Sequence, residues 1–314
     1  MRIPSEARCY DLVAVGGWTL YDHIFQMQHY PRPGETVELL PDSVVNKTYW
    51  GDCVFNVAAV AAGLGLKVAV LSVVGNDFPS CGYPEALAKL GIESKYLTID
   101  QRLPSGHSFL FSDPEGDGFC LSWRGASLFQ DEYTPSQEPL KQAKIVVINE
   151  AFDGFTLAGA QGAADAGALI ISNGMLGTAD TELLDEYLTC IDLLCISEAE
   201  GKMLLERLGI ETENDILSHG PRAVIVTHGA RGSEVITADG KTQVTPVLTD
   251  RVVDVNGAGD SFVAGVATGL LRELPLIDAV RFGAGVASFV IEAVGCQTNL
   301  PTWEQAFARA FQDK

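Results

Sequence analysis

Positive charge is scarce in this sequence. Lys and Arg together number 21 against 41 Asp and Glu residues, which gives a formal net charge of −20 over 314 residues. A nucleic-acid-binding protein normally carries a basic patch, and no cluster of Lys and Arg residues occurs here. We therefore expect no nucleic-acid partner. A nucleotide is not excluded, because a nest of backbone amides and a metal ion can hold a triphosphate locally.

Cysteine pairs and long apolar runs are also missing. The seven cysteines are odd in number and form no CxxC pair, so we expect neither a disulfide framework nor a zinc site. We therefore predict that the protein is located in the reducing cytoplasm. Residues 1–11 are charged and lack the apolar core of a signal peptide. The most apolar stretch, residues 54–74, is interrupted by an asparagine, two glycines and a lysine, which predicts a helix, a turn and a strand rather than a membrane span.

Short apolar runs alternate with helical patterns along the chain. Continuous apolar strands separated by helices are typical of a parallel sheet that is covered on both faces. We therefore expect a single α/β domain over residues 1–314, with a doubly wound, mostly parallel sheet flanked by helices. The expected strands are 12–15, 68–73, 144–148, 168–171, 192–196 and 223–227. The expected helices are 54–64, 83–91, 155–166, 181–190, 198–207, 260–273, 277–292 and 302–312.

Two segments break this rhythm and predict a small β lid. Residues 24–48 contain a proline-rich turn at 31–34, and residues 105–124 are typical of a β-hairpin around a turn at 113–118. Inserted strands with an apolar face must cover something. A lid over a binding site, or the contact face of a homodimer, meets this need. The alternative is a simple extension of the main sheet at its edge.

The strongest chemical signal is the segment VDVNGAGDSF at residues 253–262. Gly257, Ala258 and Gly259 offer little side chain, so their N–H groups at a helix N-terminus could bind phosphate oxygens. Asp260 follows directly and could take the proton from an acceptor hydroxyl that is aligned with a phosphoryl group. The structural alternative for Asp260 is a carboxylate that stabilises the start of a helix. Neither GxxxxGK[ST] nor GxGxxG occurs, so the rival phosphate loops are absent.

Residues 254–260 resemble the C-terminal signature D-T-x-G-A-G-D of the ribokinase, or PfkB, carbohydrate kinases, with Val255 where threonine is common. Other motifs similar to those of this family follow in family order along nearly the whole chain. They are 15–17 with Asp22, 34–37, Gly51 with 56–58, 74–77, 227–232, and Gly295 with Pro301. The resemblance implies a ribokinase-like fold and an ATP-dependent kinase that phosphorylates a sugar hydroxyl.

The resemblance also implies catalytic and nucleotide-binding roles. In that family the last aspartate of the signature is the catalytic base and its Gly-Ala-Gly forms the anion hole. Asp260 would therefore be the base, and Gly257, Ala258 and Gly259 would form the anion hole. The implied ATP-binding residues are Ser197, Thr227, Gly229, Gly232, Gly257 and Gly295.

A divalent and a monovalent cation follow from the same resemblance. Glu200 would act through water on the Mg²⁺ that bridges the phosphates. Many members of the family need K⁺ and some do not. In this chain, Asp254 and Asn256 would hold that monovalent cation. The family's N-x-x-E motif has Ser197 in place of the asparagine here, and serine reaches less far towards a phosphate or a metal.

Substrate contacts are predicted for five residues, namely Asp22, Gly51, Asp52, Asn56 and Glu150. A carboxylate accepts two hydroxyl hydrogen bonds and an amide both donates and accepts, which suits a vicinal diol. Glu150 follows an expected strand, at the carboxyl edge where open α/β sheets bind ligands; the alternative is a solvated loop carboxylate. Asp52 stands at the second glycine of the family's N-terminal signature. The sugar pocket is therefore unusual, or Asp52 itself binds a hydroxyl.

Other functions remain open from the sequence. A nucleoside kinase of the same family is the nearest, since residues 77–83 lack the usual G-x-x-G spacing after the aspartate. A non-catalytic sugar or nucleotide sensor is less favoured because the residues 257–260 are intact, and an oxidoreductase is disfavoured by the missing GxGxxG.

Lys47, Arg102 and Arg124 could recognise a phosphate or carboxylate on the substrate, or could be solvated lid charges. The expected partner is thus a small sugar or nucleoside.

Overall fold

An eight-stranded sheet forms the centre of the computed structural model, which describes residues 3–4, 7–40, 47–113, 118–150, 153–174, 176 and 181–311. Six strands run parallel, and the last two continue the edge in antiparallel fashion. In spatial order the strands are β14 (Gly240–Val244), β13 (Ser233–Thr237), β12 (Ala223–Thr227), β11 (Leu193–Ser197), β10 (Leu169–Asn173), β9 (Ala143–Asn149), β1 (Tyr10–Gly16) and β4 (Val68–Leu71). The prediction of a mostly parallel sheet is confirmed.

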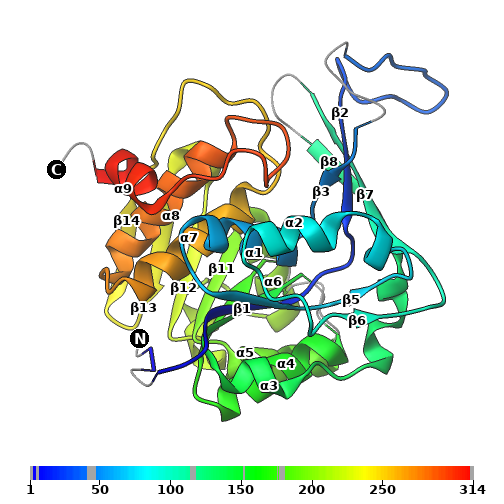
Figure 1. Cartoon of the computed structure of the whole chain (residues 1–314). Coiled ribbons are helices and arrows are strands. Elements are labelled where there is room, and N and C mark those ends of the chain that lie inside the picture. The colour runs from blue at the N-terminus through cyan, green and yellow to red at the C-terminus, as the bar shows by residue number, and fades with distance from the viewer. Residues whose placement is uncertain are drawn as a thin grey trace.

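Helices cover both faces of this sheet (Figure 1). One layer contains α1 (Cys53–Gly63), α2 (Tyr83–Lys89), α7 (Ala258–Leu271), α8 (Leu276–Val290) and α9 (Trp303–Phe311). The other contains α3 (Gln137–Lys141), α4 (Gly154–Asp165), α5 (Thr181–Cys190) and α6 (Glu198–Leu208). Successive strand residues point to opposite faces, so Leu12 and Ala14 join the first core while Val13 and Val15 join the second. This alternation explains why the central residues of the parallel strands are apolar at consecutive positions.

A separate four-stranded sheet forms the lid and projects from one end of the molecule (Figure 1). Its order is β3 (Tyr49–Trp50), β2 (Tyr21–Gln26), β7 (Ser105–Ser112) and β8 (Gly118–Gly125). The antiparallel β7–β8 pair confirms the predicted hairpin, although residues 114–117 of its turn lie outside the described residues. The first lid segment begins at Tyr21 rather than at 24, and part of the predicted segment, residues 41–46, also lies outside them. A short pair, β5 (Val73–Val74) and β6 (Thr98–Ile99), completes the strands.

Four elements that bear on the sheet and the site differ from the prediction. The antiparallel strands β13 and β14 and the short helix α3 were not expected. Helix α7 begins at Ala258, two residues earlier than predicted, with Gly257 as its N-cap. This difference matters because it places Asp260 within the first helical turn.

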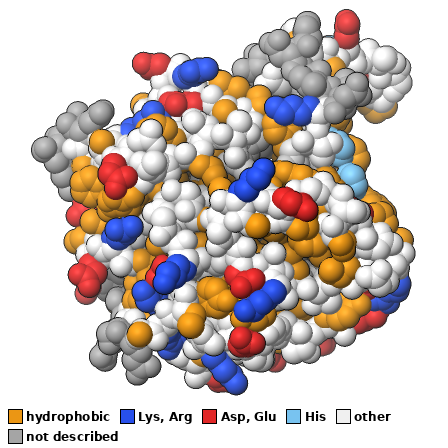
Figure 2. Space-filling model, in the orientation of Figure 1, with side chains coloured by type: hydrophobic (Ala, Val, Ile, Leu, Met, Phe, Trp, Pro, Cys, Tyr) orange, Lys and Arg blue, Asp and Glu red, His pale blue; other side chains and the backbone are white. Residues whose placement is uncertain are grey.

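The surface agrees with the charge of the sequence. On the face shown in Figure 2, Lys and Arg side chains are scattered singly among acidic and apolar ones and form no single basic patch. In the part of the chain that the structure describes, no helix combines the length and the apolar character that a membrane crossing requires.

Candidate active site

The carboxyl ends of four neighbouring strands bring polar residues to one edge of the main sheet. Strand β9 ends at Asn149, β10 at Asn173, β11 at Ser197 and β12 at Thr227. These strands are parallel and adjacent, so their ends meet at the edge where open α/β sheets bind ligands. The first turn of α7 reaches the same edge, because Asn173 contacts Asp260 there.

Asp260 is held by two amide side chains from different parts of the fold. Its exposed fraction is 7%. Its Oδ2 accepts a hydrogen bond of 2.9 Å from Asn56 Nδ2 on α1, and its Oδ1 accepts one of 2.8 Å from Asn173 Nδ2 at the end of β10. The structure thus brings the predicted base next to the predicted substrate residue Asn56. Sequence reasoning missed Asn173, although a polar residue at the end of LIISN, two positions after the apolar run LII, was a usable signal.

The glycine-rich turn before α7 leaves several N–H groups open. Gly257 adopts φ 75°, and a Cβ atom there would lie 2.4 Å from the Sγ atom of Cys296, so only glycine fits. The N–H group of Ala258 donates to the Val255 carbonyl inside the turn. Within the described chain, no acceptor takes the N–H groups of Gly257, Gly259 and Asp260. These three donors at a helix N-terminus suit an anion, whereas the predicted donor Ala258 is already used.

Asp22 lies in lid strand β2 with an exposed fraction of 8%. It packs against Gly51, where an added Cβ atom would come within 1.9 Å of Asp22 Oδ2, so a glycine is required at that position. No residue that the structure describes donates a hydrogen bond to the Asp22 carboxylate. Burial, followed by the charges of Asp52 and Asp260, raises the pKa of Asp22 well above its usual range. The open acceptors suit the hydroxyl groups of a substrate.

Asp52 has a structural function that its sequence position did not reveal. Its Oδ2 accepts from the N–H groups of Trp18 and Thr19, both at 2.7 Å, and its Oδ1 accepts from the N–H group of Val54 at 3.0 Å. It is the N-cap of α1, at φ 75°, a backbone conformation that favours glycine. The aspartate therefore joins the β1–β2 connection to the start of α1. A hydroxyl contact from Asp52 stays a prediction.

Two adjoining cavities lie beside the first turn of α7. One, of about 380 Å³, has mostly apolar walls and includes the predicted nucleotide residues Thr227, Gly229 and Gly232. The other, of about 170 Å³, has polar walls that include Asp260 and the predicted metal residue Glu200. The remaining polar residues of the second wall are Glu150, Asn173 and Ser197, and both cavities share Thr227, Gly259 and Phe262. A larger cavity of about 750 Å³ lies elsewhere, among residues 7–9, 137–142 and 162–166.

Gly257 and Gly295, also predicted to bind ATP, lie outside the walls of both cavities. The N–H group of Gly295 donates to Asp254 Oδ2 at 2.9 Å, and its Cα packs closely against the Tyr49 ring. The other carboxylate oxygen of Asp254 accepts from the backbone and side-chain nitrogens of Asn256, at 3.0 and 2.7 Å. Asp254 thereby fastens the signature segment to residue 295.

Glu200 is engaged at the start of α6. Its Oε2 accepts from both the backbone N–H and the hydroxyl group of Ser197, each at 2.7 Å, as part of a capping box. Among the described residues no group of three or more His, Cys, Asp or Glu side chains surrounds a metal-sized space. Oxygen ligands of this kind nevertheless suit Mg²⁺, which keeps several waters and binds through one or two carboxylates together with substrate phosphates. The residues present therefore fit a metal that arrives with a nucleotide.

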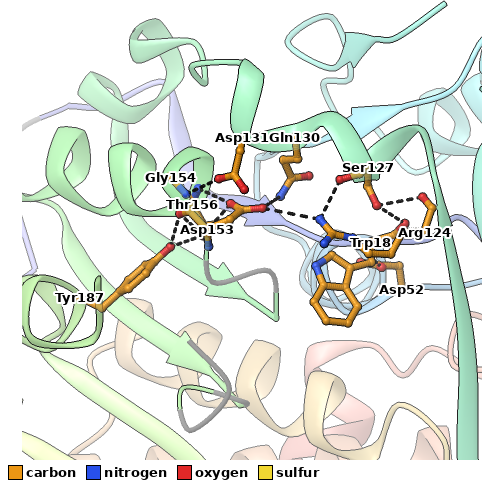
Figure 3. A network of polar contacts seen from close by, with 10 residues as sticks. All are labelled: Trp18, Asp52, Arg124, Ser127, Gln130, Asp131, Asp153, Gly154, Thr156 and Tyr187. Atoms are coloured by element: carbon orange, nitrogen blue, oxygen red, sulfur yellow. Dashed lines mark hydrogen bonds and ion pairs between the residues drawn. The ribbon is translucent and has the colours of Figure 1, made fainter. Parts of the chain in front are cut away.

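The three cationic residues considered for substrate recognition are engaged elsewhere. Arg102 pairs with Asp100 at 2.6 Å and with Glu132 at 2.9 Å. Arg124 donates to the Ser127 carbonyl at 2.8 Å, lies 3.9 Å from Asp153 and covers the Trp18 ring, as Figure 3 shows. Lys47 lies over the Tyr49 ring. All three side chains thus have partners within the protein.

Replacing Glu150 by glutamine is expected to stabilise the unliganded protein more at pH 8 than at pH 5. Burial, followed by the charges of Asp52 and Asp260, raises the pKa of Glu150 from 4.5 to about 8. A raised carboxyl pKa removes stability progressively as pH rises from the unfolded value towards the folded one. We expect a gain of about 2 kcal/mol in the free energy of unfolding at pH 8, roughly half of the full shift because the side chain is partly exposed.

Urea unfolding at the two pH values measures this difference. The exposed Glu211 provides the matched control, since Glu211→Gln removes the same charge without burial. Equal gains from Glu150→Gln at pH 5 and pH 8 would contradict the prediction.

Comparisons with known proteins bear on the family and the fold of the chain. The family model described as pfkB family carbohydrate kinase matches residues 44–303. The chain is 30% identical over 294 residues to a nucleoside kinase of Methanocaldococcus jannaschii, covering 93% of this chain and 94% of the relative. It is 26% identical to a ribokinase of Haemophilus influenzae, covering 90% and 93%. The crystal structure of the Methanocaldococcus jannaschii nucleoside kinase superposes with a TM-score of 0.85 at 28% identity, covering 98% of this chain and 100% of that one.

Proposed function

The chain belongs to the pfkB family of carbohydrate kinases, and we propose from this premise that it transfers the γ-phosphoryl group of ATP to a ribose hydroxyl of a nucleoside. A phosphotransferase with an alcohol acceptor is common to the relatives above. The observation that carries the proposal is the position of Asp260. It contacts Asn56 on the acceptor side and lines the cavity that contains Glu200.

The proposed reaction uses Asp260 as the base. An acceptor hydroxyl held by Asp22 and Asn56 loses its proton to the Asp260 carboxylate as its oxygen forms a bond to the γ-phosphorus. The bond from that phosphorus to the bridging oxygen breaks, and ADP carries the electron pair away. The N–H groups of Gly257 and Gly259 stabilise the charge on the phosphoryl oxygens.

Two cations would assist the proposed reaction. Relatives of this family use ATP with a divalent metal, and Mg²⁺ would neutralise charge on the phosphates when bound. Glu200 would hold it through water, at the polar cavity wall. We keep K⁺ at Asp254 and Asn256 as a proposal, since both residues belong to the segment that shapes the anion hole.

The acceptor is proposed to be uncharged. Asp22, Glu150 and Asp260 place three carboxyl groups on the acceptor side, and Arg102 and Arg124 are paired with other carboxylates. A phosphate or carboxylate on the substrate would meet unfavourable electrostatics beside these groups, and the third candidate cation of the described lid, Lys47, lies over the Tyr49 ring. This supports an unphosphorylated sugar or nucleoside.

Between these two acceptors, the comparisons favour the nucleoside at least as strongly as the sugar that the sequence placed first. A nucleoside kinase is the relative that shares 30% identity over 93% of the chain. Ribose is the second candidate, because a ribokinase covers nearly the same length at 26% identity. A non-catalytic sensor is disfavoured, since the open N–H groups and Asp260 are all in place.

The assembly and location remain proposals. Phe109, Phe119, Leu121 and Trp123 in the lid hairpin have exposed fractions of 36, 41, 57 and 43%. An exposed apolar face of this kind is typical of an interaction surface, which supports the predicted homodimer through the lid. We also retain a single domain over residues 1–314 and a cytoplasmic location.

A panel of acceptors with ATP and Mg²⁺ tests the proposal. We expect at least one nucleoside to give a kcat/KM about 100-fold above that of ribose, because the base adds contacts worth roughly 3 kcal/mol. Phosphorylated sugars should not react measurably. Measurement of ADP release with nucleosides, ribose, fructose and their phosphates identifies the preferred acceptor. A preference for ribose would establish the second candidate, and a preference for a sugar phosphate would contradict the charge argument.

A further inference from the structure

A continuous series of amide side chains runs through Asp260. On one side Gln297 Nε2 donates to Asn56 Oδ1 at 3.1 Å, and Asn56 donates to Asp260. On the other side Asn173 Nδ2 donates both to Asp260 Oδ1 and, at 3.0 Å, to Asn149 Oδ1. Each amide that contacts the carboxylate is therefore oriented by a second amide.

Backbone carbonyls fix the orientation of the Asn149–Asn173 pair. Asn149 Nδ2 lies 3.1 Å from the Val147 carbonyl oxygen and 3.4 Å from that of Val15. A carbonyl oxygen can only accept a hydrogen bond, so the NH₂ group of Asn149 must face the strands and its Oδ1 must face Asn173. The same reasoning directs the NH₂ group of Asn173 towards Asn149 and Asp260. Two carbonyls of the sheet thus determine that Asn173 donates to Asp260.

The electrostatic setting gives this donor a function. Asp260 is buried, and the carboxylates of Asp22, Asp52 and Glu150 act on it unfavourably. A hydrogen bond donated to a carboxylate favours its ionised form and fixes its orientation. The titratable groups that interact with Asp260 are Asp22, Asp52, Cys53, Glu150 and Cys296. Of these groups, the Cys53 thiol also hydrogen-bonds the Asp260 carboxylate, and the 2.8 Å hydrogen bond to Asp260 Oδ1 comes from Asn173.

We propose that Asn173, aligned by Asn149, is a positioning residue that keeps the Asp260 carboxylate ionised and oriented towards the acceptor hydroxyl. The inference rests on the proposed function only in taking Asp260 as the base. Asn173 acts through Asp260, so its loss should lower kcat rather than weaken acceptor binding. Asn56, in contrast, is expected to affect both.

Kinetics of three variants test the inference with the acceptor that the wild type uses. Asn173→Ala should lower kcat 10- to 100-fold and change the acceptor KM less than threefold. Ser172→Ala is the matched control, because Ser172 is the neighbouring buried polar residue of β10 and its hydroxyl has no hydrogen-bond partner among the residues that the structure describes. The kcat of this variant should stay within twofold. Asn149→Ala should give a smaller loss than Asn173→Ala. A kcat for Asn173→Ala within twofold of wild type, or a change confined to KM, would overturn the proposal.

The nearly isosteric variant Asn173→Asp separates positioning from general damage to the fold. It places a second carboxyl group about 2.8 Å from Asp260 Oδ1, and two such carboxyls share a proton. At low pH the new group is protonated and can donate, whereas at high pH it repels. The kcat of Asn173→Asp relative to wild type should therefore rise at least tenfold from pH 8.5 to pH 6. A constant ratio would overturn the proposal.

A titration without substrate gives a readout that does not depend on the proposed function. In protein labelled with ¹³C at the aspartate carboxyl carbons, the Asp260 resonance is assigned by its loss in Asp260→Asn. Its titration midpoint should lie at least one pH unit higher in Asn173→Ala than in wild type and be unchanged in Ser172→Ala. Equal midpoints would overturn the inference. A wild type that phosphorylates no acceptor would instead count against the proposed function, and the titration would still decide the role of Asn173.

Discussion

Asp260→Asn is expected to lower kcat about 10³-fold, a typical contribution of a general base, while ATP binding is retained. An asparagine cannot take the proton of the acceptor hydroxyl. Its NH₂ group would also face one of the two donors, Asn56 or Asn173, so one hydrogen bond is lost and the free energy of unfolding should fall by about 1–3 kcal/mol. Steady-state ADP release measures the rate, and calorimetry measures ATP binding.

The control for this prediction addresses the structural alternative, in which Asp260 merely stabilises a helix start. Glu304 is an exposed carboxylate in the first turn of α9. Glu304→Gln removes a helix-end charge without touching the site, and its kcat should equal that of wild type. An unaffected rate in Asp260→Asn would remove Asp260 from the mechanism.

Asp22→Asn is expected to raise the acceptor KM about 10- to 100-fold, since the NH₂ group of the asparagine cannot accept a substrate hydroxyl and an unmade hydrogen bond costs about 1–3 kcal/mol. The ATP KM and the kcat should change far less, because Asp22 lies in lid strand β2 and is not part of either cavity wall. Steady-state kinetics with the acceptor varied at saturating ATP measures the effect. An unchanged acceptor KM would show that Asp22 does not hold the acceptor.

The same substitution should stabilise the unliganded protein at neutral pH. Burial and neighbouring carboxylates raise the pKa of Asp22, so stability falls as pH rises above the ordinary carboxyl pKa, and Asp22→Asn abolishes this loss. Asp11→Asn is a control of opposite sign. Burial acts to raise the pKa of Asp11, but hydrogen bonding to Lys144 lowers it overall, so that variant should be less stable at pH 7. Thermal unfolding at pH 5 and pH 7 compares the two.

The parallel sheet and its helices could be predicted because each signal is local. Within the predicted strands 144–148 and 223–227, residues 145–148 and 223–226 are apolar at every position, which is the pattern that a strand buried on both faces needs. The segment 254–260 could likewise be assigned, since the small residues that a phosphate requires and the adjacent Asp260 are consecutive in the chain. The edge strands β13 and β14 were missed. Three of the five side chains in β14 are polar and exposed, so this strand lacks a buried-strand pattern.

What the sequence determined by itself, then, is the class of fold and the location of the turn that we propose binds phosphate. The tertiary structure alone decided which groups hold Asp260, because Asn56 and Asn173 lie 204 and 87 residues away from it in the chain. It also decided that Asp52 caps α1 and that Arg102 and Arg124 are paired. The physical reason is that hydrogen bonds and ion pairs act over about 3–4 Å in space, and only the folded chain brings such distant residues within that range.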